Sequence, residues 1–227
     1  MASIPELSEQ LAKVTTDYRV GEVEAPTAAH VQKWLGQFDG GVQLPLLTEL
    51  VHVLNQTYIP KAKVETFISG LVENPKLATD KPAEFWPSVK FLDIQRGGRS
   101  QHEMLAIFAG HLKQKTGLVL ADCGAGDPKT FVYLDDGLFT GNRILNDLRD
   151  WLKTAPTQAI LHVIVIANHA GGTYYLQTNF AKASRASIEY PEVSHFLFLG
   201  KPLKTSQPIL RDEAEIQSSM FPAPTSR

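Results

Sequence analysis

Apolar side chains recur every three or four residues through the first 80 residues, which is the period of amphipathic helices. Three such stripes stand out: Val31, Trp34, Leu35 and Phe38; then Leu46, Leu47, Leu50, Val51 and Leu54; then Val64, Phe67, Ile68, Leu71 and Val72. Thr27 is a suitable N-cap for the first, and Gly40-Gly41 and Pro60 separate them. Residues 1–80 are predicted to form an all-helical region, a bundle or cap packed on the following domain, with Trp34 and Phe38 in its core.

The pattern changes beyond residue 88. Apolar runs of strand length cover residues 89–94, 118–122, 131–134, 159–167, 188–190 and 196–199, and helical stripes cover residues 104–112, 144–152 and 173–183. This alternation predicts an α/β domain over residues 88–227, with a mostly parallel sheet flanked by helices. Residues 78–87, which contain Lys81-Pro82 and Trp86-Pro87, are expected to be a linker.

The most informative stretch for function begins where the apolar run 131–134 meets two acids. Asp135 and Asp136 would end a buried strand, and Thr140-Gly141-Asn142 would open the next helix. The backbone N–H groups at such a helix start suit a phosphate, and Gly141 would let a ligand approach the backbone. Two adjacent carboxylates need compensation, which ribose hydroxyls and a hydrated Mg²⁺ would supply. The stretch predicts a sugar-phosphate site in preference to a solvent-facing turn of two acids.

A second loop offers a further anion site. Arg96, Gly97, Gly98 and Arg99 follow the first strand, and backbone donors with two guanidinium groups can surround a pyrophosphate. Ser100 with Glu103 is predicted to form a capping box for the next helix. Surface arginines beside a glycine turn are common, so the loop indicates an anion site only in combination with the acid pair.

Two other polar segments have simpler explanations. Gly124-Ala125-Gly126 resembles a nucleotide loop in its spacing, but Pro128 and the next strand leave no room for the helix that such a loop needs. A connecting turn is therefore expected. His169 follows the longest apolar run and could contact a ligand, although capping of the next helix is the more common role; His162, inside that run, is expected to be a core residue.

Composition narrows the class of protein. The chain has 227 residues, of which 43% are hydrophobic and 20% charged, as is ordinary for a soluble globular protein. The formal net charge of −2 gives no electrostatic reason to expect binding to nucleic acid or to a membrane. The single cysteine, Cys123, excludes an intramolecular disulfide. With no apolar stretch typical of a signal peptide, a cytoplasmic location is expected.

The segment from Val132 to Gly141 resembles the phosphoribosyl pyrophosphate motif of type I phosphoribosyltransferases: an apolar run, two acids, a short variable stretch and Thr-Gly. With helices ahead of the motif, the chain is most similar to the divergent PRTase-CE type of bacterial conflict and defence systems. The resemblance implies catalytic roles for Asp135 and Asp136 at the ribose hydroxyls. The residues around the 5-phosphate would be Phe139, Thr140, Gly141, Asn142 and Arg143. It also implies Mg²⁺ as a cofactor.

Two positions depart from that family's pattern. Phe139 stands where some members have an acid that accepts a proton from a purine, and Arg143 replaces a closing hydroxyl residue. The expected function is Mg²⁺-dependent binding of phosphoribosyl pyrophosphate or a related ribose phosphate, with transfer to an unknown acceptor other than a salvaged purine, in antiphage defence. The alternative is a non-catalytic sensor or regulatory subunit of the same fold, working beside a protein partner.

Overall fold

The computed structural model describes residues 2–75, 77–78, 80–156, 159–186 and 195–198. Its N-terminal helices are α1 (Ile4–Val14), α2 (Ala28–Leu35), α3 (Gly40–Thr57) and α4 (Lys61–Val72). They agree with the helical region expected from the sequence. The Thr27 hydroxyl accepts a hydrogen bond from the backbone N–H of His30 at 3.3 Å, so the predicted N-cap of α2 is confirmed.

The first three helices share a small core of their own, which contains Leu7, Leu11, Val31, Leu35, Leu47 and Val51. Trp34 and Phe38 do not belong to it. Their side chains are 37% and 38% exposed and form an edge-on pair with ring centroids 5.1 Å apart. The expectation that these two aromatic residues are core was wrong, because the face of α2 turned toward α1 is occupied by Val31 and Leu35.

The remainder of the described chain is α/β. Its elements are α5 (Pro82–Phe85), the 3-10 helix η1 (Trp86–Ser88), β1 (Val89–Phe91), α6 (Ser100–Thr116), the 3-10 helix η2 (Leu120–Asp122), β2 (Thr130–Leu138), α7 (Asn142–Trp151), β3 (Ile160–Asn168), α8 (Ala170–Ala186) and β4 (His195–Phe198). Within the described ranges the strands pair in the order β1-β2-β3-β4, and every pair is parallel. The predicted fold class is confirmed.

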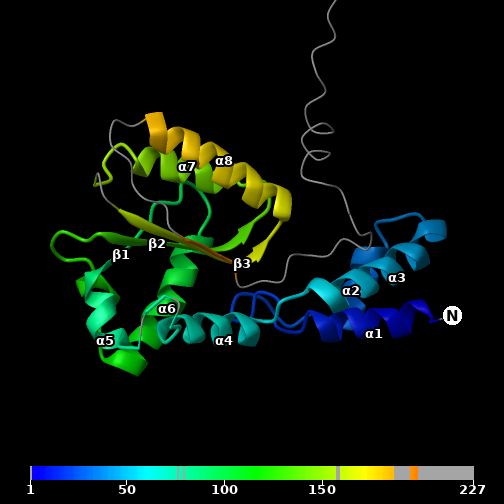
Figure 1. Ribbon diagram of the computed structural model, residues 1–227. Coiled ribbons are helices and arrows are strands. Elements are labelled where there is room, and N and C mark those ends of the chain that lie inside the picture. The colour runs from blue at the N-terminus through cyan, green and yellow to red at the C-terminus, as the bar shows by residue number, and fades with distance from the viewer. Residues whose placement is uncertain (1, 76, 79, 157–158, 187–194, 199–227) are drawn as a thin grey trace, which may run out of the picture.

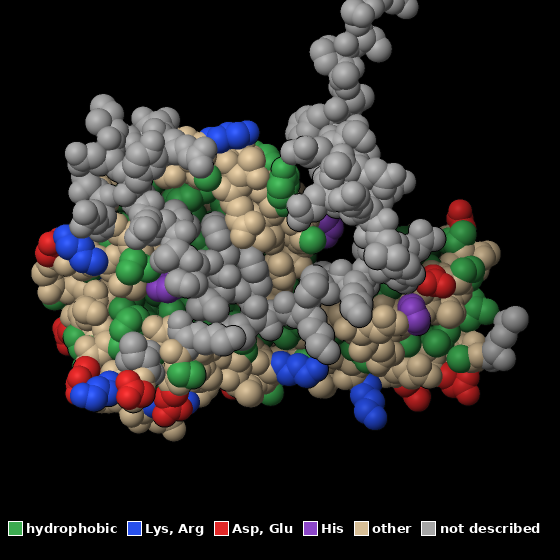
Figure 2. Space-filling view, viewed as in Figure 1, with side chains coloured by type: hydrophobic (Ala, Val, Ile, Leu, Met, Phe, Trp, Pro, Cys, Tyr) green, Lys and Arg blue, Asp and Glu red, His purple; other side chains and the backbone are tan. Residues whose placement is uncertain are grey.

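Helices cover both faces of the sheet, as parallel strands require. In Figure 1, α7 and α8 lie above the sheet, and α4 and α6 lie below it. Side chains alternate along β2, so Phe131 and Tyr133 pack with α7 and α8, whereas Val132 and Leu134 pack with α6. In Figure 2 the described acidic and basic side chains lie interspersed over the visible face, in keeping with a net charge of −2.

Helix α4 packs with the sheet domain. Its Ile68, Leu71 and Val72 belong to the same buried cluster as Val132 of β2 and Ile164 of β3. This cluster joins α4 to strands on the other side of the domain boundary that the sequence predicts near residue 80. The division of the chain at that point stays a prediction. Among the described helices, none combines the length and the apolar character that a membrane crossing demands.

Two sequence expectations are corrected here. Residues 78–87 include α5 and η1 instead of a linker, and Trp86 is fully buried with its indole N–H donated to the carbonyl of Val72 at 2.9 Å. Residues 118–122 form no strand, because the N–H groups of Asp122 and Cys123 bond locally to the carbonyls of Val119 and Leu120. The strand expected at 188–190 lies outside the described residues.

Replacing Trp86 with alanine should destabilise the fold by about 3–5 kcal/mol, since the substitution leaves a large cavity and an unpaired Val72 carbonyl. Chemical denaturation measures the change. Trp34→Ala is the matched control and should cost about 1 kcal/mol or less, because its ring is already partly in water. Equal losses for the two variants would show that Trp86 does not hold α4 to the sheet.

Candidate functional site

The acid pair lies inside a strand. Strand β2 continues to Leu138, and Asp135 pairs in register with Val165 of β3. The expectation that the strand ends at the acid pair was wrong, because β3 is equally long and supplies pairing partners beyond the acids. Alternation along the strand separates the two side chains: Asp135 is 1% exposed, whereas Asp136 faces solvent.

Hydrogen bonds from three directions hold the carboxylate of Asp135. Its Oδ1 accepts from the Ser100 hydroxyl at 2.7 Å and from the backbone N–H of Asp136 at 2.9 Å, and its Oδ2 accepts from Gln95 Nε2 at 3.2 Å. Burial raises the pKa of Asp135 to about 6, although the bonds from Ser100 and Asp136 act in the opposite direction. The side chain thereby ties β2 to the β1–α6 loop, residues 92–99.

The first turn of α6 fixes that loop from within. The buried side chain of Gln101 accepts the backbone N–H groups of Ile94 and Gln95 at 2.7 and 2.9 Å. The predicted capping box was wrong: Arg99 is the N-cap and makes no side-chain cap bond, and Ser100 uses its hydroxyl on Asp135. Sequence reasoning missed Gln101 because polar residues around a loop give no periodic signal.

A second buried acid was also missed. Asp147 lies on the apolar face of α7 and accepts the Tyr133 hydroxyl at 3.0 Å and the backbone N–H of Arg96 at 3.4 Å. The Tyr133 hydroxyl oxygen also lies 3.5 Å from Asp135 Oδ2, and burial raises the pKa of Tyr133. An acid within an otherwise apolar helix stripe was the sequence signal that could have located this group.

The loop from β2 to α7 is fixed against α8. Gly141 is the N-cap of α7 with φ of 75°, and a Cβ there would lie 2.5 Å from the carbonyl oxygen of Gly172. A Cβ on Gly172 would lie 2.0 Å from the carbonyl oxygen of Phe139. Gly141 is thus required for backbone packing as well as for the left-handed conformation. The backbone N–H of Asn142 donates to Thr140 Oγ1 at 3.4 Å. This N–H group was expected to be unpaired at the helix start, and it instead has a long hydrogen bond within the loop.

Arg143 connects the two loops. Its Nη1 donates to the carbonyls of Arg96 and Gly97. These bonds hold Gly97-Gly98, the glycine turn, beside the start of α7. Phe139 is 61% exposed, and its ring lies over Gly137, where a Cβ would come within 2.9 Å of it. Phe139 and Arg143, the two departures from the family pattern, therefore both occupy defined positions beside these loops.

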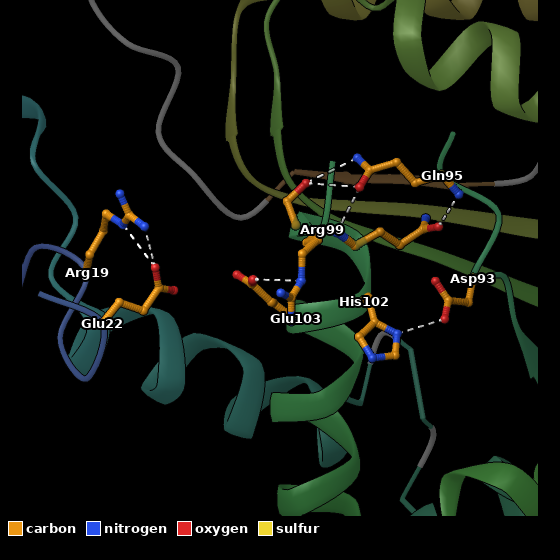
Figure 3. A network of polar contacts seen from close by, with 9 residues as sticks. Arg19, Glu22, Asp93, Gln95, Arg99, His102 and Glu103 are labelled. Carbon is orange, nitrogen blue, oxygen red and sulfur yellow. Dashed lines mark hydrogen bonds and ion pairs between the residues drawn. The ribbon is translucent and has the colours of Figure 1, made fainter. Parts of the chain in front are cut away.

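These groups surround a pocket of about 330 Å³. Its lining contains the predicted site residues Asp135, Asp136, Phe139, Thr140, Gly141, Arg143 and Gly98, together with Gln95, Ser100, Gly137, Leu138 and Ile144. The other predicted residues, Arg96, Gly97, Arg99 and Asn142, lie outside the lining. Arg96 pairs with Asp150 at 3.0 Å, and Arg99 lies 3.9 Å from Glu103, as Figure 3 shows for the second pair.

The N-terminal region reaches this loop. In Figure 3, Arg19 and Glu22, whose side chains form an ion pair at 2.6 Å, lie on the side to which Arg99 projects. The pKa of Glu22 is lowered mainly by Arg19 and, more weakly, by Arg99. Asp93 and His102 form another pair, at 3.0 Å, on the side of the loop away from Gln95.

The remaining candidates make local backbone contacts. Gly124 packs on Lys90 and donates its backbone N–H to the carbonyl of Pro87 at 2.9 Å, and no helix follows before β2, so the expected connecting turn is confirmed. His169 is exposed and its carbonyl accepts the N–H of Thr173 at 3.0 Å, as the cap of α8. Over the described ranges, His, Cys, Asp and Glu form no group of three suited to hold a metal by themselves.

Comparison with protein-family models gives a match to PRTase-CE over residues 31–218, which begin within α2 and include the sheet and the pocket. No curated protein and no solved structure matches the chain.

Asp135→Asn should change how stability depends on pH. A carboxyl group whose pKa rises from 3.8 to about 6 on folding favours the folded state below pH 4, and this contribution of about 3 kcal/mol disappears as the pH rises through 6. The variant should therefore gain in stability relative to wild type, by up to that amount, between pH 4 and pH 7. Denaturation at both pH values measures it; a constant difference between the two proteins would contradict the perturbed pKa.

Proposed function

The chain belongs to the PRTase-CE family, and from this premise we propose that it binds phosphoribosyl pyrophosphate, or a related ribose phosphate, together with Mg²⁺. We further propose that it transfers the phosphoribosyl group to an acceptor. The observation that carries the proposal is the pocket of about 330 Å³, in which the acid pair of β2 meets the start of α7 and the glycine turn.

The 5-phosphate is assigned to the end of the pocket formed by Thr140, Gly141 and Arg143. Backbone N–H groups at the start of a ten-residue helix, with the positive end of its dipole, favour a phosphate there. A cation at the start of a helix is unfavourable unless an anion lies against it. Arg143 uses one nitrogen on the glycine turn and has further N–H donors for the ligand.

The two acids are assigned different roles. Asp136 is exposed at the pocket and is the residue proposed to bind the ribose hydroxyls. Both oxygens of Asp135 already accept hydrogen bonds from the protein, so it is proposed to position Gln95 and Ser100. This assignment differs from the equal roles that the motif alone implies.

The pyrophosphate is assigned to the glycine turn. Gly98 lines the pocket, and the side chains of Arg96 and Arg99 are 77% and 82% exposed. Exposed ion pairs such as theirs contribute little to stability, about 0–1 kcal/mol, so either guanidinium can turn toward a ligand at low cost.

Mg²⁺ fits the donors that are present. The ion is commonly held by one or two carboxylates with ligand phosphates and water, and Asp136 is an exposed carboxylate beside the proposed phosphates. When bound, Mg²⁺ would neutralise charge on the leaving pyrophosphate. In the proposed transfer, the bond from C1 to pyrophosphate breaks and a bond from C1 to the acceptor forms, with Asp136 and the arginines providing electrostatic stabilisation.

Phe139 limits the acceptor. It cannot take a proton, so assistance to an incoming purine is absent from this position, and the proposed acceptor is not a salvaged purine. Such an activity is proposed to serve the defence role that the PRTase-CE resemblance implies.

A second candidate function is binding without catalysis. It is favoured by Asp135, whose carboxylate is buried and fully engaged within the protein. Such a chain would sense a ribose phosphate and report it to a partner. Pyrophosphate release from phosphoribosyl pyrophosphate, measured with nucleobases, nucleotides and proteins as acceptors, distinguishes the two functions, because a sensor releases none.

Asp136→Asn should weaken Mg²⁺-dependent binding of ribose 5-phosphate. Loss of a hydrogen bond to a charged group costs about 1.5–3 kcal/mol, or roughly 10- to 150-fold in affinity. Isothermal calorimetry with and without Mg²⁺ measures it. Asp127→Asn is the matched control, since Asp127 is an exposed acid outside the pocket and should leave affinity unchanged. If wild type and Asp136→Asn both fail to bind ribose 5-phosphate, the ligand assignment is lost.

The double variant Arg96→Ala/Arg99→Ala should lose about tenfold or more in affinity for phosphoribosyl pyrophosphate while retaining most affinity for ribose 5-phosphate. The reason is that only the first ligand carries a pyrophosphate to meet the glycine turn. Competition between the two ligands measures the ratio. Equal losses for both would mean that the arginines do not distinguish the pyrophosphate end.

A further inference from the structure

A second cavity lies away from the proposed ligand pocket. It is an open groove of about 600 Å³ bounded by β1, the exposed side of α6 and residues 119–123. Its floor and walls are mostly apolar and include Phe91, Leu105, Ala106, Ala109, Val119 and Leu120. At its rim are Lys90, Lys113 and the Asp93–His102 pair.

The groove follows an unpaired sheet edge. Strand β1 is the outer strand next to β2, and no described strand pairs with its other side. The N–H of Leu92 bonds to the carbonyl of Val132, so the backbone groups of Lys90 and Leu92 face β2. Because alternate residues of a parallel strand face the same neighbour, the N–H and carbonyl of Phe91 face the groove. A backbone exposed in this way can pair with another chain.

The stretch 118–122 leaves this position vacant. Its sequence is that of a strand, yet it turns into η2 beside the groove and pairs with nothing in the described sheet. Val119 remains 47% exposed, which extends the apolar surface. Within the described ranges the edge of the sheet is thus without a strand partner beside Phe91, whereas Gly124 packs on Lys90 next to it.

The charges at the rim restrict the occupant. Neither Lys90 nor Lys113 has an ion-pair partner among the described residues, whereas Lys115 pairs with Glu73 and Lys129 with Asp127. A second copy of this chain, adding its own β1, would bring lysines toward lysines, which is unfavourable. An acidic segment would meet both ammonium groups.

From the groove, the open edge and the two lysines, we infer that this surface binds an extended segment of a protein partner, which adds a parallel or antiparallel strand to β1. Apolar residues at every second position of the segment enter the groove, and acids beside them pair with Lys90 and Lys113. Backbone hydrogen bonds to Phe91 would provide affinity. The apolar groove and the two lysines would provide specificity for the side chains of the segment. The inference is independent of what binds in the pocket at β2.

The test uses the full chain and a blocked hexapeptide that alternates valine with glutamate, with its valine–lysine counterpart as the control peptide. The acidic peptide should bind, and the Phe91 amide should exchange its hydrogen at least about tenfold more slowly when the peptide is saturating, because that N–H enters a strand ladder. The lysine peptide should bind more weakly.

Charge reversal makes the test specific. Lys90→Glu/Lys113→Glu should weaken binding of the acidic peptide by about fivefold or more and strengthen binding of the lysine peptide, since the glutamates of the acidic peptide would then meet carboxylates instead of ammonium groups. Lys113→Glu alone, on an exposed helix position, provides a second variant that leaves β1 intact. Lys33→Glu/Lys153→Glu carries the same change in net charge away from the groove and should behave as wild type.

Three outcomes would overturn the inference. Equal binding of both peptides by wild type and by the reversed variant would remove the charge argument. A Phe91 amide that exchanges slowly without peptide would mean that the chain itself fills the groove. Self-association that depends on Lys90 and is relieved by the acidic peptide would assign the edge to a second copy.

Discussion

The hydrogen bonding of the buried Asp135 carboxylate is the interaction on which the site depends. A carboxylate that is 1% exposed must be compensated by hydrogen bonds, and its donors come from both the neighbouring backbone and the β1–α6 loop. Satisfying one acid therefore fixes Gln95 and Ser100. The same burial leaves Asp136, one residue later in the strand, as the acid that solvent or a ligand can reach.

A second set of contacts completes the site from the opposite direction. Gly141 and Gly172 bring the β2–α7 loop against α8 with no space for a side chain, so the start of α7 is held in one position. Arg143 then extends from that helix to the carbonyls of the glycine turn. Two segments that are 46–47 residues apart in sequence thus meet at one pocket.

The open edge of β1 has a different physical origin. Buried side chains specify both faces of the sheet. Beside β1, Gly124 packs on Lys90, and the local hydrogen bonds of η2 replace a strand pairing in the described ranges. The β1–α6 loop contributes to the lining of both cavities, with Gln95 and Gly98 in the ligand pocket and Asp93 in the apolar groove.

Periodicity alone determined the helical N-terminal region, the α/β class and the strand–loop–helix unit that contains Asp135 and Thr140, because burial imposes repeating apolar positions on helices and strands. The same pattern failed at residues 118–122 and at Trp34, where the outcome depends on which neighbours are available to cover an apolar side chain. The roles of Gln101 and Arg143 were decided only by tertiary structure. Hydrogen bonds between segments that are far apart in the chain leave no periodic pattern in the sequence. A polar residue at such a position is equally compatible with an exposed place on the surface.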